Sequence, residues 1–182
     1  MKTKTRKLVI NSLLLAMGLL LHQITPVLGL PMQPDMALAM LFTIMVLNKE
    51  DYKTCLVAGI VTGVFTALTT KFPAGQLPNV IDKVFTANIM YIIMYLTYKL
   101  PFIKKLSTKK QDTIVSAIIL PIGTAISGTI FLLSAQILVG LPGSFTTLFL
   151  VAVAPATALN LVAGMFLFKI VNISISRLNY QS

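Results

Sequence analysis

The sequence KFPAGQLPNVIDK, from Lys71 to Lys83, decides how this chain is interpreted, because long apolar segments flank it on both sides. Within it, Pro73, Gly75 and Pro78 predict a break in any helix, since proline lacks a backbone N–H and glycine restrains the backbone least. The stretch also gathers amide, acidic and basic side chains, which are costly at membrane depth without partners or a ligand. It therefore predicts a binding site, and the alternative is a hydrated loop with charges at the membrane interface.

Four polar side chains carry the chemistry of this stretch. Gln76 and Asn79 offer paired hydrogen-bond donors and acceptors, and Asp82 and Lys83 bring both signs of charge to the start of the next apolar run. Neighbouring side chains on a helix point about 100° apart. We therefore expect that Asp82 and Lys83 do not both face one pocket, so that one meets a ligand and the other a neighbouring helix or the interface.

The composition is that of an integral membrane protein. The 182 residues are 56% hydrophobic and only 11% charged, whereas soluble domains are about 25% charged. The net charge of +10 would suggest nucleic-acid binding in a soluble chain. Here the basic residues lie between apolar runs, so membrane orientation explains them and no nucleic-acid partner is expected. The single Cys55 excludes an intrachain disulfide and a cysteine-rich metal site.

Six apolar segments follow one another along the chain. The first could be a signal peptide, but no A-x-A cleavage site follows it, so we interpret it as a retained span. The second has an apolar run of only 12 residues, Met36 to Leu47, against about 20 needed to cross the hydrocarbon, so alone it could be re-entrant. The predicted spans are about 8–21, 35–47, 54–70, 80–100, 113–139 and 145–173.

Charge distribution decides between five and six crossings. If the second segment crosses, every Lys and Arg except Lys71 and Lys83 lies on the side of the N-terminus. If it does not, the five lysines between residues 99 and 110 lie outside, which the positive-inside rule disfavours. The sequence therefore predicts a single-domain, all-α membrane protein, residues 1–182, with six transmembrane helices and both termini cytoplasmic.

Several residues have predicted structural roles. Asp35 precedes the second span as a helix cap. Gly59, Gly63 and Ala67 recur every four residues and form a small-residue ridge for close helix packing. We interpret Ser127 and Asn160, inside the fifth and sixth spans, as helix–helix hydrogen-bonding residues rather than ligand contacts.

The chemistry that is missing argues against an enzyme. No G-x-x-x-x-G-K-[ST] phosphate loop and no G-x-S-x-G motif occurs. His22 is the single histidine, so a multi-histidine zinc site is excluded, and we interpret it as interfacial. Asp82 has only Asp35 as a second acid on its side. We expect no catalytic residue, no metal ion and no cofactor.

What remains is recognition of a solute. The outer segments combine polar groups with phenylalanines, which suits a small amphoteric molecule with an aromatic body, because most pockets have apolar walls and a few placed polar groups. The polar groups are Gln33, Asp35, Gln76, Asn79, Asp82, Lys83 and Gln136, and the nearby rings are Phe72, Phe85, Phe131 and Phe145.

Three stretches make the chain resemble a known family. They are Pro34-Asp35-Met36, the run GIVTGVFTALTT from Gly59 to Thr70, and above all FPAGQLPN from Phe72 to Asn79, followed by Asp82-Lys83. With these motifs the chain resembles the tryptophan-specific TrpP group of substrate-binding S components of energy-coupling factor (ECF) transporters. The resemblance covers most of the chain in size and span order, and it implies a multi-pass protein of a bacterial plasma membrane.

The resemblance implies a mode of transport. A six-helix S component captures L-tryptophan near the outer face, beneath the loops after the first, third and fifth spans, and topples in the membrane to deliver it. It works with a transmembrane T component and two cytoplasmic ATPase subunits, which agrees with the missing phosphate loop. In the family an A-x-x-x-A pair on the first span docks the T component. This chain has Ser12 and Ala16 at that spacing, and ordinary helix packing is the alternative.

For tryptophan, the residues take the following expected roles. Asp82 or Asp35 meets the ammonium, Lys83 or Lys71 the carboxylate, while Gln76 and Asn79 bind polar groups and Phe72 and Phe145 pack on the indole. The full predicted set is Asp35, Lys71, Phe72, Gln76, Asn79, Asp82, Lys83, Gln136 and Phe145. The alternatives are an autonomous permease or channel for an aromatic or amphoteric solute, and an intramembrane enzyme using His22 or Asp82.

Overall fold

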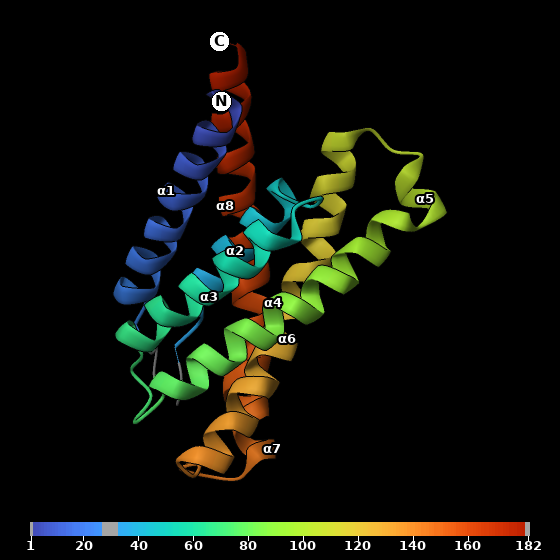
Figure 1. The fold of residues 1–182 in the computed structure, drawn as a ribbon. Helices are drawn as coiled ribbons and strands as arrows, with labels where there is room; N and C mark the ends of the chain where they lie inside the picture. Colours follow the sequence, from blue (N-terminus) through green and yellow to red (C-terminus); the bar gives the residue numbers. More distant parts are fainter. Residues whose placement is uncertain (1, 27–32, 181–182) are drawn as a thin grey trace.

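The computed structural model describes residues 2–26 and 33–180, and this part of the chain is helical without strands (Figure 1). The predicted all-α class is confirmed. Residues 1, 27–32 and 181–182 lie outside the described residues, so the two ends of the predicted domain and part of the loop after the first span do too. The helices are α1 (Lys2–Ile24), α2 (Met36–Leu47), α3 (Tyr52–Thr69), α4 (Gln76–Lys99), α5 (Pro101–Lys104), α6 (Thr108–Leu138), α7 (Phe145–Leu148), the π-helix η1 (Phe149–Val153) and α8 (Ala154–Tyr180).

Five helical segments in the described residues are long and apolar enough to cross a membrane, so a multi-pass membrane protein is supported. The 12-residue α2 is shorter than these, and a sixth crossing stays a prediction. The five segments are Lys4–Ile24, Tyr52–Thr69, Gln76–Lys99, Thr108–Leu138 and Phe145–Arg177.

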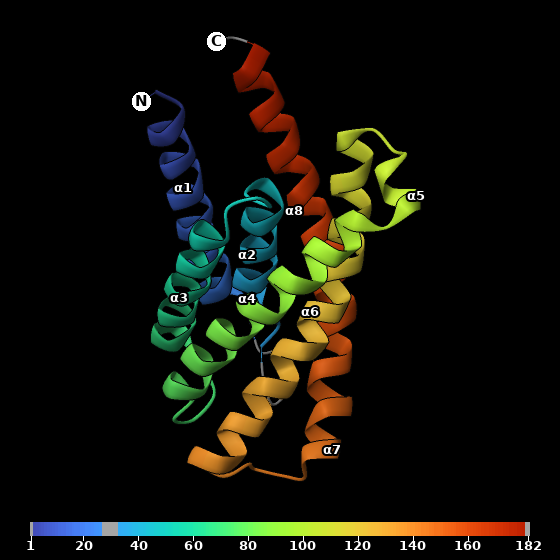
Figure 2. The ribbon, with the colours of Figure 1, turned by 45° about the vertical axis from the view of Figure 1, so that its right-hand side comes forward.

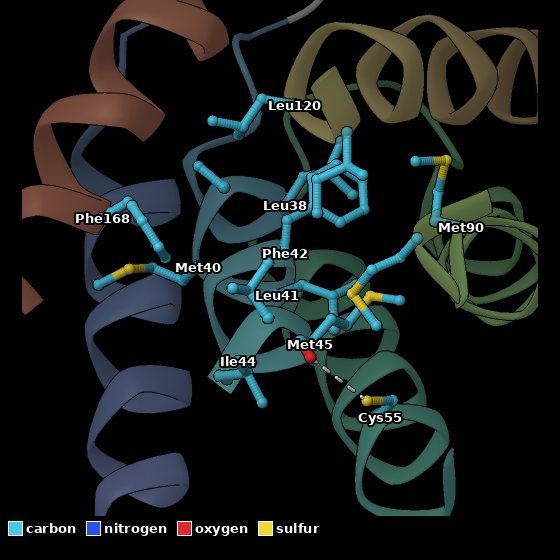
Figure 3. Close-up of a cluster of buried hydrophobic side chains, with 14 of the residues drawn as sticks. Leu38, Met40, Leu41, Phe42, Ile44, Met45, Cys55, Met90, Leu120 and Phe168 are labelled. Carbon is cyan, nitrogen blue, oxygen red and sulfur yellow. Dashed lines mark hydrogen bonds between the residues drawn. The ribbon is translucent and has the colours of Figure 1, made fainter. Parts of the chain in front are cut away.

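The short helix α2 is the centre of the bundle. Ten of its 12 residues are buried, and α1, α3, α6 and α8 pack around it. A helix that is apolar on all sides is typical of such a central position. Phe42 packs so closely against α6 that a Cβ at Gly123 would lie 2.2 Å from its ring. Figure 3 shows the core around α2, with Leu38, Met45, Met90, Leu120 and Phe168 converging from four helices.

The predicted small-residue ridge on α3 packs against α4. A Cβ at Gly59 would lie 2.5 Å from the Cβ of Ala87, and a Cβ at Gly63 would lie 3.2 Å from the Cβ of Lys83. The close approach therefore depends on the missing side chains and brings the start of α4 into the bundle. The predicted packing role of the ridge is confirmed.

The connection into α4 differs from the sequence-based expectation. We expected Pro78 to break the helix, but α4 already begins at Gln76 and Pro78 lies in its first turn. Proline is tolerated there because the first backbone N–H groups of a helix have no intrahelical acceptor. The break is confined to the turn before it, where Ala74 has φ 51° and the Gly75 N–H donates to the Phe72 carbonyl at 3.0 Å.

Two aspartates cap neighbouring helices. Asp35 accepts a hydrogen bond from the Leu38 N–H at 3.0 Å, which confirms its predicted capping role for α2. Asp51 caps α3 in the same way through the Thr54 N–H at 3.1 Å. The hydrogen bonds from the Thr54 backbone and hydroxyl lower the pKa of the Asp51 carboxyl.

The start of α1 and the end of α8 lie at the same end of the molecule, together with α5 (Figures 1 and 2). The turn between α3 and α4 and the helix α7 lie at the opposite end. The polar stretch that opens α4 is therefore far from both termini. Which end faces the cytoplasm stays a prediction.

Replacing Gly59 by alanine tests the α3–α4 contact. The new Cβ meets the Cβ of Ala87, and neither atom can rotate away. Alanine favours the helix by about 1 kcal/mol relative to glycine, but we expect the steric clash to exceed this gain and to lower the unfolding free energy by about 1–3 kcal/mol. Cys55 is buried in the core, so the temperature at which a thiol-reactive dye labels it reports unfolding. We expect a midpoint lower by about 2 °C or more. The control is Gly143→Ala, where nothing lies within 4 Å of the new Cβ. Equal midpoints for both variants would contradict the packing argument.

Candidate binding site

Four titratable side chains meet at the end of the bundle opposite the termini. His22 comes from α1, Asp35 caps α2, and Asp82 and Lys83 belong to the second turn of α4. Lys83 Nζ lies 2.7 Å from Asp35 Oδ2 and is also paired with Asp82 Oδ2. His22 Nε2 lies 3.9 Å from Asp35 Oδ1. Asp82 is 0% and Lys83 2% exposed, so this charge cluster is shielded by the protein.

The expectation that Asp82 and Lys83 could not both face one pocket was wrong. Both line the same cavity and contact each other. The reason is the long side chain of lysine: its Cβ packs at the glycine ridge of α3, and its flexible stem carries Nζ back to the carboxylates.

Hydroxyl groups complete the surroundings of Asp82. Thr86 donates to Asp82 Oδ1 at 2.8 Å, and Ser127 of α6 donates to Asp82 Oδ2 at 2.8 Å. Ser127 also accepts a hydrogen bond from Lys83 Nζ at 3.2 Å. Buried ion pairs are stable only when hydrogen bonds satisfy their remaining polar atoms, and the cluster meets this condition across α4 and α6.

His22 lies near the end of α1 and is buried within the protein, at 4% exposure; its depth relative to the membrane interface stays a prediction. The Thr69 hydroxyl donates to the Phe65 carbonyl at 2.8 Å, so it can only accept from His22 Nδ1, 2.7 Å away. His22 Nε2 then accepts from Gln33 Nε2 at 2.8 Å. Gln33 Nε2 also lies 2.9 Å from His22 Nδ1. These contacts join the end of α1 to α3 and to the residues just before α2.

A cavity of about 70 Å³ lies beside the charge cluster. One side is polar and includes His22, Asp35 and Lys83, and the other is apolar and includes Phe72, Phe131 and Val153. The rings of Phe72 and Phe131 meet edge to face with their centroids 5.2 Å apart. A cavity with charges at one side and aromatic rings at the other suits a molecule with both kinds of group.

Six of the nine residues predicted for substrate binding line this cavity. The six are Asp35, Lys71, Phe72, Asn79, Asp82 and Lys83. Lys71 is exposed at the cavity edge, where its Nζ donates to the Thr25 carbonyl at 2.6 Å. Asn79 is buried and donates from Nδ2 to the Gly75 carbonyl at 2.8 Å.

The other three predicted residues do not line the cavity. Gln76 is the exposed first residue of α4, and Gln136 is exposed on the outer face of α6. Phe145 stacks on Phe149, with ring centroids 6.2 Å apart. Gln76 and Gln136 are therefore on exposed helix faces, whereas Phe145 packs against the apolar cluster that contains Phe72 and Phe131.

Sequence reasoning gave Ser127 and Asn160 structural roles, and both line the cavity. They do form helix–helix hydrogen bonds: Asn160 Nδ2 donates to Thr124 Oγ1 at 3.3 Å, from α8 to α6. Asn160 Oδ1, however, is buried without a hydrogen-bond partner in the described structure. The only signal in the sequence was their polarity inside apolar spans, which does not separate the two roles.

The predicted docking pair lies on the surface of α1. Ser12 and Ala16 are exposed and line an open groove between α1 and α3. No group of three or more His, Cys, Asp or Glu side chains within residues 2–26 and 33–180 is placed to hold a metal ion.

Comparisons with known proteins agree on one family. The sequence model described as "Tryptophan transporter TrpP" matches residues 4–176. A protein from Clostridium perfringens (strain 13 / Type A) named "Probable tryptophan transport protein" is 53% identical over 176 residues, 97% of this chain and 96% of the relative. Proteins with the same name from Clostridium acetobutylicum and Bacillus subtilis (strain 168) are 46% and 40% identical, over 92% and 98% of this chain and 92% and 97% of the relatives. No solved structure matches the chain significantly.

Removing the cation tests the charge cluster. In Lys83→Met, Asp82 keeps its burial but loses its counter-charge, and breaking a buried pair costs about 3–5 kcal/mol. We expect a much lower unfolding midpoint, measured by dye labelling of Cys55. The additional change Asp82→Asn should recover part of the loss, because it removes the unpaired charge.

The matched control is Lys71→Met, because Lys71 is exposed and exposed charges contribute little to stability. If Lys83→Met and Lys71→Met unfold at the same temperature, the cluster does not stabilise the fold as described.

Proposed function

Because this chain belongs to the TrpP family of tryptophan transporters, we propose that it is the substrate-binding S component of an ECF-type importer, which captures L-tryptophan at the outer face for ATP-driven uptake. The sequence-based assignment to the family is confirmed, as is the prediction that the chain is not an enzyme. The S-component role, the site and the partners are the proposal.

The observation that carries the proposed site is the buried charge cluster beside an aromatic-walled cavity. Tryptophan as a zwitterion brings one ammonium and one carboxylate, and the cluster holds one ammonium and two carboxylates. The ligand carboxylate therefore pairs with Lys83, and its ammonium pairs with the protein carboxylate that Lys83 releases. Such pairs are far stronger in a dry site than in water.

Asp35 is the carboxylate that exchanges partners. Its side chain is 18% exposed, and it holds Lys83 at 2.7 Å. Asp82 is fully buried and is held by Thr86 and Ser127 as well as by Lys83. Asp82 therefore keeps Lys83 in position, and Asp35 meets the ligand ammonium.

The indole ring occupies the apolar side of the cavity. At about 70 Å³ the cavity is smaller than typical ligand pockets of about 300–1,000 Å³, so tryptophan enters only when the side chains rearrange. The edge-to-face pair of Phe72 and Phe131 is the natural place for this, because a third ring inserted between them keeps aromatic contacts on both faces. The proposed binding set is Asp35, Lys71, Phe72, Asn79, Asp82 and Lys83.

Energy for uptake comes from other subunits in this proposal. The printed sequence has no phosphate-loop motif, so a T component and two cytoplasmic ATPase subunits supply it. The exposed pair Ser12 and Ala16 on α1 lines the open groove beside α3, and a helix of the T component packs there against these small side chains. Both termini are cytoplasmic in the plasma membrane, which agrees with their position at one end of the bundle (Figure 2).

Tryptophan binding to the purified chain tests the site. The chain contains no tryptophan, so indole fluorescence reports the ligand alone. We expect Asp35→Asn to weaken binding about 10-fold or more, because a hydrogen-bonded charge contributes about 1.5–3 kcal/mol, while asparagine still caps α2. The matched control is Asp51→Asn, the same change at the cap of α3, which should bind normally. Equal affinities for both variants would remove Asp35 from the site.

Transport in liposomes tests the division of labour. The chain alone should bind tryptophan but not accumulate it, and adding the T component and ATPases with ATP should give uptake. Ala16→Leu should prevent co-purification with the T component without changing the affinity for tryptophan. The control Ala158→Leu, at an exposed alanine of α8, should co-purify with the T component as the wild-type chain does. Full uptake by the chain alone would instead establish an autonomous permease.

A further inference from the structure

The side chain of Asn160 has a buried hydrogen-bond acceptor that is unpaired in the described part of the structure. The residue is 0% exposed and lines the cavity. Its Nδ2 donates to Thr124, while its Oδ1 has no hydrogen-bond partner. A buried acceptor without a partner is unfavourable for a folded protein, so its presence at a binding cavity points to a donor on the ligand.

Thr124 decides which atom of the Asn160 amide faces the ligand. The Thr124 hydroxyl donates its only hydrogen to the Leu120 carbonyl at 2.8 Å, so its oxygen can only accept. The amide of Asn160 must therefore present its NH₂ group to Thr124. The oxygen is the atom that remains for the cavity, and it can bind only a donor.

The acceptor and the charge cluster are linked through neighbouring turns of α6. Thr124 lies three residues before Ser127 on α6, which is about 4.5 Å along the helix axis. Ser127 contacts both Asp82 and Lys83. Asn160 therefore contacts α6 about one turn before the residue that contacts the charge cluster, and both residues of α6 line the same cavity. The apolar wall with Phe131 and Val153 borders the same cavity.

The second unpaired acceptor at the cavity lies elsewhere. Gln33 Oε1 is also buried without a partner, but the Gln33 side chain contacts His22, which lies 3.9 Å from Asp35. Gln33 Oε1 therefore lies beside the charge cluster, where the ligand ammonium binds in the proposed function. Asn160 Oδ1 is the unpaired acceptor that α8 contributes to the cavity.

We propose that Asn160 Oδ1 accepts a hydrogen bond from the indole N–H of bound tryptophan, and that this contact makes the site select tryptophan over aromatic amino acids without a ring N–H. The inference rests on the proposed role of the cavity as the tryptophan site. Indole N–H is a donor only, so it complements an atom that can only accept. A site built to bind such a group discriminates strongly against analogues that lack it, because the protein atom is then left unpaired.

A comparison of two ligands on two proteins tests this contact. The ligands are L-tryptophan and 3-(3-benzothienyl)-L-alanine, in which sulfur replaces the N–H in a ring of nearly the same shape. The wild-type chain should prefer tryptophan about 10-fold or more. Leucine has a volume similar to that of asparagine. In Asn160→Leu, the affinity for tryptophan should fall until this preference disappears, while the analogue binds as tightly as to the wild-type chain or more tightly.

The ratio of the two affinities is the readout, so a general loss of stability cancels within each protein. Asn172→Leu, the same change on the same helix outside the cavity, should keep the wild-type ratio. If Asn160→Leu does not fold, Asn160→Ala gives the same comparison.

The outcomes separate the two proposals. If the wild-type chain binds neither ligand, the proposed function fails. If it binds tryptophan but shows no preference over the analogue, or if Asn160→Leu and Asn160→Ala keep the preference, the tryptophan site stands and the role of Asn160 is overturned.

Discussion

The pairing of one buried lysine with two carboxylates is the constraint around which this structure is arranged. Lys83 reaches Asp35 at the cap of α2 and Asp82 on its own helix, and Ser127 ties the pair to α6. Charges this deeply buried are stable only with every partner in place. The starts of α2 and α4 and the middle of α6 must therefore come together at one point, and the cavity proposed to bind the ligand lies at that point.

Features that depend on neighbours in the sequence could be predicted. Helical class follows from long apolar segments, Asp35 precedes an apolar run as caps do, and the four-residue spacing of Gly59 and Gly63 defines one face of a helix whatever packs on it. The crowding of polar groups between Lys71 and Lys83 also pointed to the region of the cavity, which six of the nine predicted residues line; that these residues bind a substrate stays a prediction.

Features that depend on side-chain paths or on distant helices could not be predicted. The angle of about 100° between neighbouring helical residues predicted that Asp82 and Lys83 point in different directions. The lysine side chain is, however, long enough to bend back and bring its ammonium to the Asp82 carboxylate. Ser127 is 45 positions from Asp82, and Asn160 is 36 from Thr124. Their polarity was visible in the sequence, but whether it served packing or a cavity depended on which helices become neighbours.

The π-helix η1 has a consequence for everything that follows it. A turn closed by i→i+5 bonds holds one residue more than an α-turn, and each residue advances an α-helix by about 100°. Phe149–Val153 thus acts as a phase shift between α7 and α8. Without that extra residue, α8 would be rotated about its axis by about 100° relative to α7, and Asn160 would face a different neighbour. The wide turn therefore determines which face of α8 points into the protein.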